Sequence, residues 1–194
     1  YSTLANHYQM AEKFPQAVDY LLKASHHAAS VYAFVNTAEY MQNALDLLLG
    51  DEERPGRAEL LRQLSQIYIY TGRPDKAIEA GMGGAALWRD LGDSVKQAEA
   101  YLDVSFCFHW MGRESDAVEH IERALHCLLA DRLTEGSYAV ALSIWISAEI
   151  ENRPGETRLL AKAYSQWGLA ATIKGDPLLA REKLQQANTL HAAI

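Results

Sequence analysis

The chain has 194 residues, 49% of them hydrophobic, which is enough to build a sizeable buried core. Its 25 acidic and 18 basic residues give a formal charge of −7, which argues against direct binding to nucleic acid or to an anionic membrane, because both require a basic face. No segment approaches the ~20 apolar residues of a membrane span, and no signal peptide is visible. We therefore expect a cytoplasmic protein, and we expect Cys107 and Cys127, which sit in apolar helical contexts, to be free thiols rather than a disulfide.

The first segment, LANHYQMAEKFPQAVDYLLKA (residues 4–24), predicts two helices joined by a turn. A large residue beside a small one, followed by an aromatic residue on the same face, indicates the buried stripe of a first helix. A turn residue comes next, and small residues then recur along a second helix. The residues that define this unit are Leu4, Ala5, Tyr8, Glu12, Ala17, Leu21 and Ala24.

The next segment predicts a further pair of helices. TAEYMQNALDLLL (Thr37–Leu49) has the spacing of a second helix, and its first helix would cover Ala24–Ala33. Two alternatives follow for Pro15–Ala33: one long helix shared by two hairpins, or two helices with a kink near Ser25.

The unit of residues 4–24 recurs three times, with a glycine at each turn. Gly72, Gly112 and Gly175 can adopt the left-handed conformation that ends many helices. Pro74 and Pro177 suit the first turn of the helix that follows, where no amide donor is needed, and Asp176 is a good N-cap. The alanines at the packing position of these second helices are Ala77, Ala117 and Ala180, equivalent to Ala17.

The stretch Gly81-Met82-Gly83-Gly84 lies inside one of these second helices, at its two packing positions. It is not a phosphate-binding loop, because it lacks the Lys-Ser/Thr pair and follows no strand. We predict instead that a bulky neighbour, Trp88 or Trp110, approaches the helix closely here, with a kinked or frayed helix as the alternative.

The remaining gaps in the repeat must hold additional helices. One covers about Ser137–Ile150, and Glu156–Lys174 is again either one long helix or a kinked pair. The count is nine to eleven α-helices.

This pattern resembles the tetratricopeptide repeat (TPR), and the four copies cover about half of the chain. The resemblance implies an all-α fold, a right-handed superhelix of stacked antiparallel helical hairpins. We expect residues 1–194 to form a single domain of this kind. Because Tyr1 lies almost inside a helical pattern, we also expect the chain to be a fragment of a larger protein.

The opening segment, residues 4–48, has a narrower resemblance. It is similar to the TPR version that follows an ATPase module in large bacterial signalling proteins with an adenylyl/guanylate cyclase domain or a helix-turn-helix transcription-factor domain. The resemblance implies a regulatory, partner-sensing segment. The matching residues are His7, Tyr8, Ala11, Ala17, Tyr20, Leu21, Ala24, Ala28, Tyr32, Ala33, Ala44 and Leu45.

No constellation of residues predicts catalysis, a cofactor or a metal site. The most metal-like set is Cys107, His109, His120, His126 and Cys127, but it contains no C-x-x-C or H-x-x-x-H pair. No G-x-S-x-G motif occurs, and no cysteine stands beside an evident base. We therefore expect a protein that is not an enzyme and that needs no cofactor.

In TPR stacks the first helix of each hairpin lines a concave groove, so the resemblance implies a partner-binding surface. Aromatic residues and arginine are typical anchors of protein interfaces, and four of the groove positions would form an aromatic patch beside an arginine. The alternative is that Phe106 and Trp110 merely pack against the next hairpin. The groove residues are Asn6, Gln9, Arg62, Gln66, Tyr70, Phe106, His109 and Trp110, with Leu102, Ser165 and Leu169 facing the same way.

The sequence thus predicts a non-catalytic protein-interaction or sensor domain of a bacterial signal-transduction or transcription-regulatory protein. A protein or peptide partner, a flanking domain of the same parent chain or a small effector would occupy the groove, without direct contact to nucleic acid or membrane. The alternative is a general protein–protein interaction scaffold, or a self-association module, without a regulated ATPase or cyclase neighbour.

Overall fold

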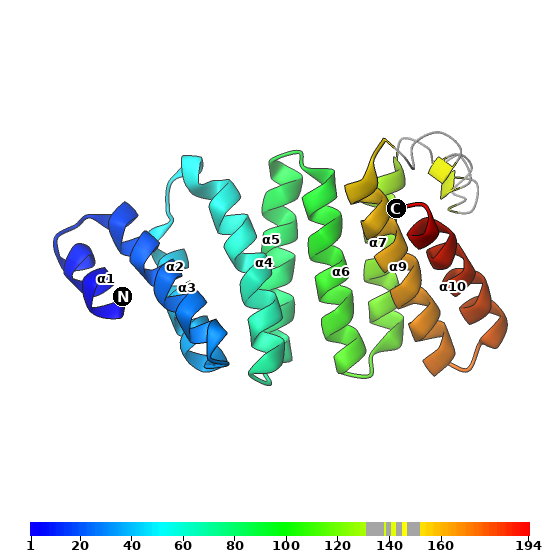
Figure 1. Cartoon of the computed structure of the whole chain (residues 1–194), viewed down its shortest axis with the longest axis horizontal. Helices are drawn as coiled ribbons and strands as arrows, with labels where there is room; N and C mark the ends of the chain where they lie inside the picture. The colour runs from blue at the N-terminus through cyan, green and yellow to red at the C-terminus, as the bar shows by residue number, and fades with distance from the viewer. Residues whose placement is uncertain (131–137, 139–140, 143–144, 147–151) are drawn as a thin grey trace. The chain divides into compact units, whose positions relative to one another are not determined.

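A computed structural model describes residues 1–130, 138, 141–142, 145–146 and 152–194 of the chain. This part of the chain contains nine α-helices, one short 3-10 helix and no strand (Figure 1). The prediction of an all-α fold built from helical hairpins is confirmed. None of the described helices is long and apolar enough to cross a membrane.

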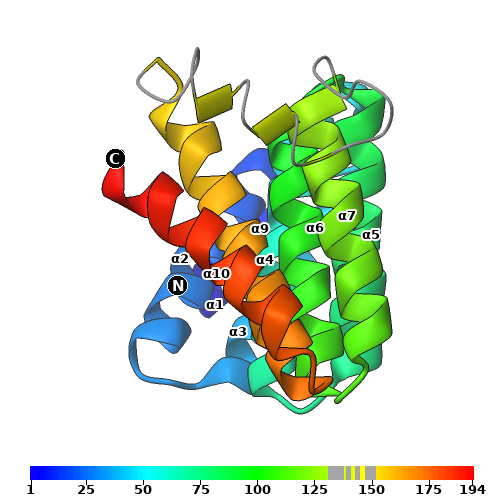
Figure 2. The same cartoon turned by 90° about the vertical axis from the view of Figure 1, so that its right-hand side faces the viewer.

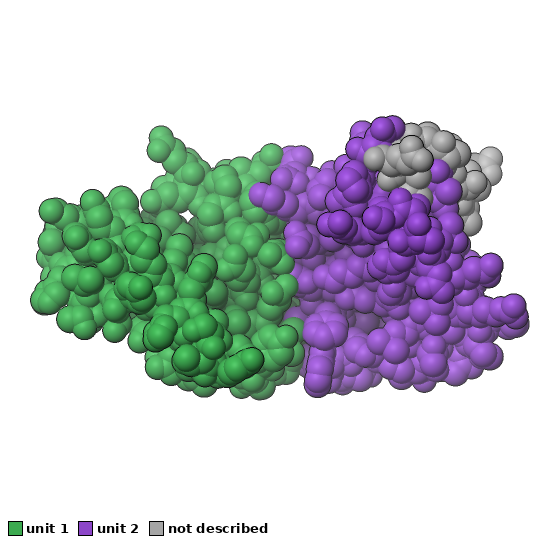
Figure 3. Space-filling view, in the orientation of Figure 1, with its two compact units in different colours: residues 1–91 green, residues 92–194 purple. Residues whose placement is uncertain are grey.

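The chain divides into two compact units, residues 1–91 and residues 92–194 (Figure 3). In each unit, helices that follow one another along the chain pair through a short turn. The pairs with the most extensive packing are α4 with α5 in unit 1, and α6 with α7 and α9 with α10 in unit 2. The hairpin is therefore the building block of both units.

Unit 1 contains α1 (Ser2–Met10), α2 (Phe14–Ser30), α3 (Phe34–Leu47), the 3-10 helix η1 (Asp51–Glu53), α4 (Arg54–Tyr70) and α5 (Pro74–Asp90). The alternatives for Pro15–Ala33 are decided, because α2 is one continuous helix that packs against both α1 and α3. It ends at Ser30, before Tyr32 turns the chain into the left-handed conformation. The helix predicted at Thr37–Leu49 corresponds to α3, which begins earlier, at Phe34.

Unit 2 contains α6 (Ser94–Trp110), α7 (Glu114–Leu129), α9 (Pro154–Ile173) and α10 (Pro177–Ala192). Figure 2 looks onto this unit, where α9 lies beside α10 and also packs against α6 and α7. The alternatives for Glu156–Lys174 are decided in favour of one continuous helix, α9. The helix predicted at Ser137–Ile150 falls mostly outside the described residues, and the five described positions within it are helical.

Five hairpins close with the same turn. One residue of each turn has a positive φ, at Glu12, Tyr32, Gly72, Gly112 and Gly175. The next backbone N–H then donates to a carbonyl near the end of the helix, as in Arg73 N to Tyr68 O at 2.9 Å. This is the Schellman arrangement, which gives a partner to a carbonyl that the helix end would leave unpaired. The prediction of glycine turns at residues 72, 112 and 175 is confirmed.

Small residues bring the two helices of each hairpin together. Ala17 and Ala77 are fully buried, and Ala117 and Ala180 are 1% and 6% exposed, as the repeat predicts. The N-cap predicted at Asp176 is also present, because its carboxylate accepts from Leu179 N at 3.0 Å. Two large residues predicted at packing positions are exposed instead: Leu4 is 44% exposed and Leu184 is 41% exposed.

Gly84 of α5 meets the backbone of α4, and this corrects the prediction that Trp88 or Trp110 approaches the helix at this residue. A Cβ atom on Gly84 would lie 3.1 Å from Ala58 O and 3.5 Å from Arg62 N. The stretch is regular α-helix, so the alternative of a kinked or frayed helix is also wrong. A side chain at residue 84 would therefore crowd the main chain of α4.

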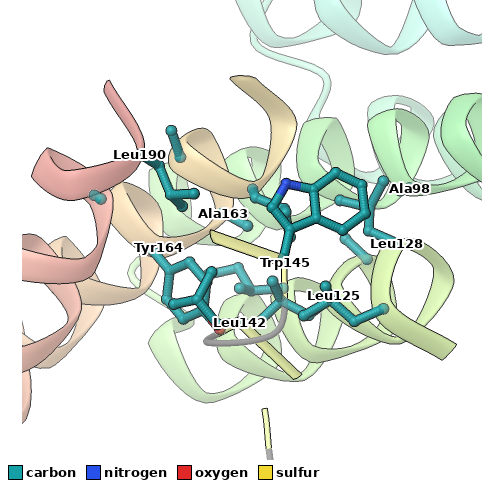
Figure 4. Packing of buried hydrophobic residues seen from close by; sticks show 14 of the residues in the cluster. Ala98, Leu125, Leu128, Leu142, Trp145, Ala163, Tyr164 and Leu190 are labelled. Atoms are coloured by element: carbon teal, nitrogen blue, oxygen red, sulfur yellow. The ribbon is translucent and has the colours of Figure 1, made fainter. Parts of the chain in front are cut away.

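The core of unit 2 centres on Trp145 and Tyr164, which are both fully buried. Figure 4 shows them in one cluster with leucines of α7 and α10, including Leu128 and Leu190. The Trp145 indole N–H donates to Thr157 Oγ1 at 3.1 Å, so the polar atom of this buried ring has a partner. This core fixes α9 against α6 and α7 and thereby shapes the surface described next.

Candidate functional site

In unit 1, the predicted groove residues lie on α1 and α4. Asn6 and Gln9 are exposed on α1, and Gln66 is exposed on α4. The side chain of Arg62 is mostly buried and pairs with Glu59, with Arg62 Nη2 and Glu59 Oε1 2.8 Å apart. This ion pair holds the guanidinium against α4.

Tyr70 is 66% exposed at the end of α4, and its ring stacks on Phe34 of α3 with centroids 5.0 Å apart. Phe34 in turn contacts Tyr32 edge-to-face, with centroids 6.1 Å apart. These two contacts were not predicted from the sequence, although Tyr32 lies in the turn before α3 and Phe34 begins that helix. An exposed aromatic surface in unit 1 therefore comprises Tyr32, Phe34 and Tyr70.

In unit 2, the predicted residues Phe106, His109 and Trp110 all lie on α6. Phe106 is 40% exposed and Trp110 is 67% exposed, and their rings meet edge-to-face with centroids 6.0 Å apart. Both rings are too exposed for the alternative that they merely pack against the next hairpin.

A cleft of about 190 Å³ opens beside these residues, between α6, α7 and α9; we call it the α6–α9 cleft. Phe106 and His109 line it from α6, and Ser165 and Leu169 line it from α9. These four residues were predicted from separate copies of the repeat to face one surface, and the structure places them around one opening. Tyr70 and the other unit 1 residues do not line it.

Two polar contacts hold α9 against α6 behind the cleft. The side chains of Lys162 and Asp103 form an ion pair at 3.0 Å, and Gln166 Nε2 donates to Leu102 O at 3.4 Å. The packing of α9 also explains a wrong prediction: Leu102, expected to face the groove, is fully buried because it belongs to the core cluster that α9 completes.

The polar floor of the cleft is a histidine–glutamate pair. Glu114 is only 8% exposed in its side chain, and its carboxylate lies 3.1 Å from His109 Nδ1. Glu114 also stands in the first turn of α7, where the unpaired N–H groups and the helix dipole favour a negative charge. Glu114 was not predicted from the sequence, because an acidic residue after a glycine turn is common in the first turn of any helix.

The size and lining of the cleft restrict what it can hold. Pockets for drug-sized ligands and cofactors typically have volumes of ~300–1,000 Å³, whereas this cleft has about 190 Å³. Its walls combine an aromatic ring, a leucine and a few polar groups. Such a cleft suits one protruding side chain of a larger partner.

Other reactive side chains lie away from this cleft. Cys107 is buried, with its thiol donating to Asp103 O at 3.2 Å, and Cys127 is partly buried. Burial raises the pKa of the Cys127 thiol, which disfavours the reactive thiolate. Among the described residues, no group of three or more His, Cys, Asp and Glu side chains is placed to hold a metal ion.

No family model and no curated protein matches the chain. Solved structures share its fold. BtubC (BKLC) from P. vanneervenii aligns over 99% of this chain and 88% of its own length, with a TM-score of 0.51 and 15% identity. The TPR-like repeats of a Podospora anserina protein assigned as a kinesin light chain align over 98% and 92%, with a TM-score of 0.52 and 17% identity. The likeness shows a TPR-like helical-repeat fold, and the narrower resemblance to signalling ATPases stays a prediction.

Proposed function

We propose that the chain is a non-catalytic protein-interaction domain, and that it binds an extended peptide segment of a partner protein on the first-helix faces of its hairpins. The observation that carries this proposal is the α6–α9 cleft, where Phe106 and Leu169 are 40% and 46% exposed on either side of an opening sized for one side chain. Exposed aromatic and leucine side chains around a concave site exclude water from an inserted anchor and so favour binding.

The remaining predicted residues would make further contacts with the partner protein, each within its own unit. Trp110, beside Phe106, would cover the peptide next to its anchor. In unit 1, the exposed Tyr70–Phe34 stack and the polar residues Asn6, Gln9, Arg62 and Gln66 would provide a second set of contacts. Large, rigid aromatic rings suit this role because little side-chain entropy is lost when a partner covers them.

We further propose that this binding serves regulation in a bacterial signalling protein, with an ATPase module before the repeat and an output domain elsewhere in the parent chain. The support is the resemblance of residues 4–48, together with the single long helix α2 that two hairpins share. A helical stack held by nearest-neighbour contacts can pass a change of packing from one hairpin to the next. Sequencing the parent gene on both sides tests this part, and flanks without an ATPase module would contradict it.

Peptide selection tests the binding proposal. A displayed library of random 12-residue peptides is panned on the whole chain, and the affinity of the recovered peptides is measured by fluorescence anisotropy. We expect Leu169→Ala, at the cleft, to weaken binding by about tenfold, the effect of losing an interface anchor. Leu178→Ala is the matched control, because Leu178 is an 80% exposed leucine of α10 that does not line the cleft.

The proposal fails if the library yields no binding peptide, or if both leucine variants bind the recovered peptides as the original chain does. Circular dichroism melting of each variant separates a loss of binding from a loss of fold. Tyr70→Ala, made in parallel, reports whether unit 1 takes part: we expect a smaller loss of affinity than at Leu169, because Tyr70 lies on an open surface.

A further inference from the structure

The side chain that enters the α6–α9 cleft can be assigned a charge. Resting on the function proposed above, we infer that the cleft recognises a basic side chain, arginine or lysine, of the bound peptide. The cleft combines a buried carboxylate, a second hydrogen-bond acceptor and the ring of Phe106, which the exposed ring of Trp110 meets outside the cleft lining. An acidic or purely apolar side chain matches only part of this lining.

The carboxylate of Glu114 is the central acceptor. An ionised carboxylate offers about four lone-pair sites and no donor, and the single His109 ring nitrogen, 3.1 Å from both Oε1 and Oε2, can fill only part of them. With only 8% of the Glu114 side chain exposed, little water reaches the carboxylate. A guanidinium or ammonium group would fill the remaining sites with charge-assisted hydrogen bonds, which are the stronger kind.

Gln166 supplies a second acceptor in the wall of the same cleft. Its amide nitrogen donates to Leu102 O, a carbonyl that can only accept, and this fixes the orientation of the amide. The amide oxygen, Oε1, is buried and has no hydrogen-bond partner within the described part of the chain. A buried acceptor of this kind is rare and favours a ligand that brings N–H groups.

The aromatic pair suits the same ligand. The exposed faces of Phe106 and Trp110 attract a cation that lies within ~6 Å of a ring, and Phe106 lines the cleft itself. Leu169 on the opposite wall can pack against the methylene groups of an arginine or lysine stem. One basic side chain therefore matches both the apolar walls and the polar floor.

Two lysines close to this region contact other residues. Lys174, directly after α9, has its Nζ atom 3.4 Å from Ser115 Oγ. The Lys162 ammonium lies 3.0 Å from Asp103 Oδ1, on the side where α6 and α9 pack together. The formal charge of −7 over the whole chain also favours the approach of a basic peptide over an acidic one. Both observations agree with an external cation at Glu114.

The test uses the peptides recovered from the random library on the whole chain. We expect them to share a basic residue, and we expect replacing its arginine with neutral citrulline, which keeps the shape of the side chain, to weaken binding at least tenfold. Glu114→Gln should cause a similar loss for the arginine peptide and almost none for the citrulline peptide. Glu119→Gln is the matched control, an equal change of charge on α7 at an exposed residue outside the cleft.

The outcomes separate this inference from the function on which it rests. Peptides whose binding depends on Leu169 but not on a basic residue or on Glu114 overturn the basic-side-chain assignment and leave the proposed function intact. If the binding of the peptides depends on neither Leu169 nor Glu114, or if the library yields no peptide, both the inference and the proposed function are overturned. The comparison of arginine and citrulline peptides uses the unaltered chain. It therefore tests the need for a basic side chain even if Glu114→Gln proves unstable in thermal melting.

Discussion

Gly168 of α9 and Leu184 of α10 lie so close that a side chain at residue 168 has no space. A Cβ atom on Gly168 would stand 2.6 Å from Leu184 Cγ and 3.3 Å from Leu184 N. Gly168 holds the small position of the last copy of the repeat, and its contact sets how closely the two helices of that hairpin approach.

We expect Gly168→Ala to lower the free energy of unfolding by about 2 kcal/mol, as overpacking of a well-packed contact does. In the Leu184→Ala background the crowding Cγ is gone, and the same change should be neutral or stabilise by up to ~1 kcal/mol, the helix-propensity gain of alanine over glycine. Urea unfolding of the four proteins measures the coupling. An equal effect of Gly168→Ala in both backgrounds would show that the contact with Leu184 does not limit the packing.

Two neighbouring glycines of α5 provide a second packing test. Gly84→Ala places a Cβ 3.1 Å from Ala58 O, a main-chain atom that cannot move aside easily, whereas Gly83→Ala meets only Leu61 Cδ1 at 3.5 Å. We expect Gly84→Ala to destabilise by about 1 kcal/mol and Gly83→Ala to stabilise by up to ~1 kcal/mol. Thermal melting of both variants checks the opposite signs, and two stabilising changes would contradict the close approach of α4.

The elements that the sequence predicts well are those set by local chemistry. The glycine turns, the proline starts and the buried alanines each depend on residues close in the chain, so their pattern appears in the sequence itself. The partner of Gly84 was predicted wrongly, because a missing side chain indicates that something is near but not what it is. The sequence of α5 does not indicate that the neighbour of Gly84 is the backbone of α4.

In the candidate site, too, the features set by local sequence were predicted and those set by tertiary packing were not. The repeat register placed Phe106, His109 and Leu169 toward one surface, because position within a helix follows from periodicity. It also placed Leu102 there, although Leu102 is fully buried, since the extent of burial depends on how α9 packs over α6. Glu114 was missed for a related reason: its burial depends on the tertiary contact with α6, and an acidic residue at a helix start usually serves the helix alone.

In the turn after α1, replacing Glu12 is expected to stabilise the chain. Glu12 has a φ of 56°, a conformation that costs a residue with a Cβ about 1 kcal/mol more than it costs glycine. Glu12→Gly should therefore raise the free energy of unfolding by about 1 kcal/mol. Lys13→Gly, one residue later at a φ of −94°, should lower it slightly by making the unfolded chain more flexible. Chemical denaturation that shows the same sign for both variants would contradict this account of the turn.

The buried side chain of His120 is expected to make the stability of the folded chain depend on pH. Its side chain is 7% exposed and packs against Phe108, with ring centroids 4.9 Å apart. Burial lowers the pKa of His120 below the ordinary value of 6.5, and the nearby positive charge of Arg123 acts in the same direction, against the hydrogen bond to Asp116 O and the charges of Glu119 and Asp116. The folded chain therefore holds the neutral ring at pH values where the unfolded chain already binds a proton.

Because the unfolded state binds more protons between the two pKa values, the contribution of His120 to stability is complete above pH ~6.5 and is lost as the pH falls toward the lower, folded-state pKa. We expect the original chain to lose on the order of 1 kcal/mol more than His120→Gln when the pH falls from about 7.5 to about 5.5. His26→Gln, at an exposed histidine, is the control and should keep the original pH dependence. Urea unfolding at both pH values measures the difference, and identical losses in the original chain and in His120→Gln would show that the buried ring is not the group that titrates.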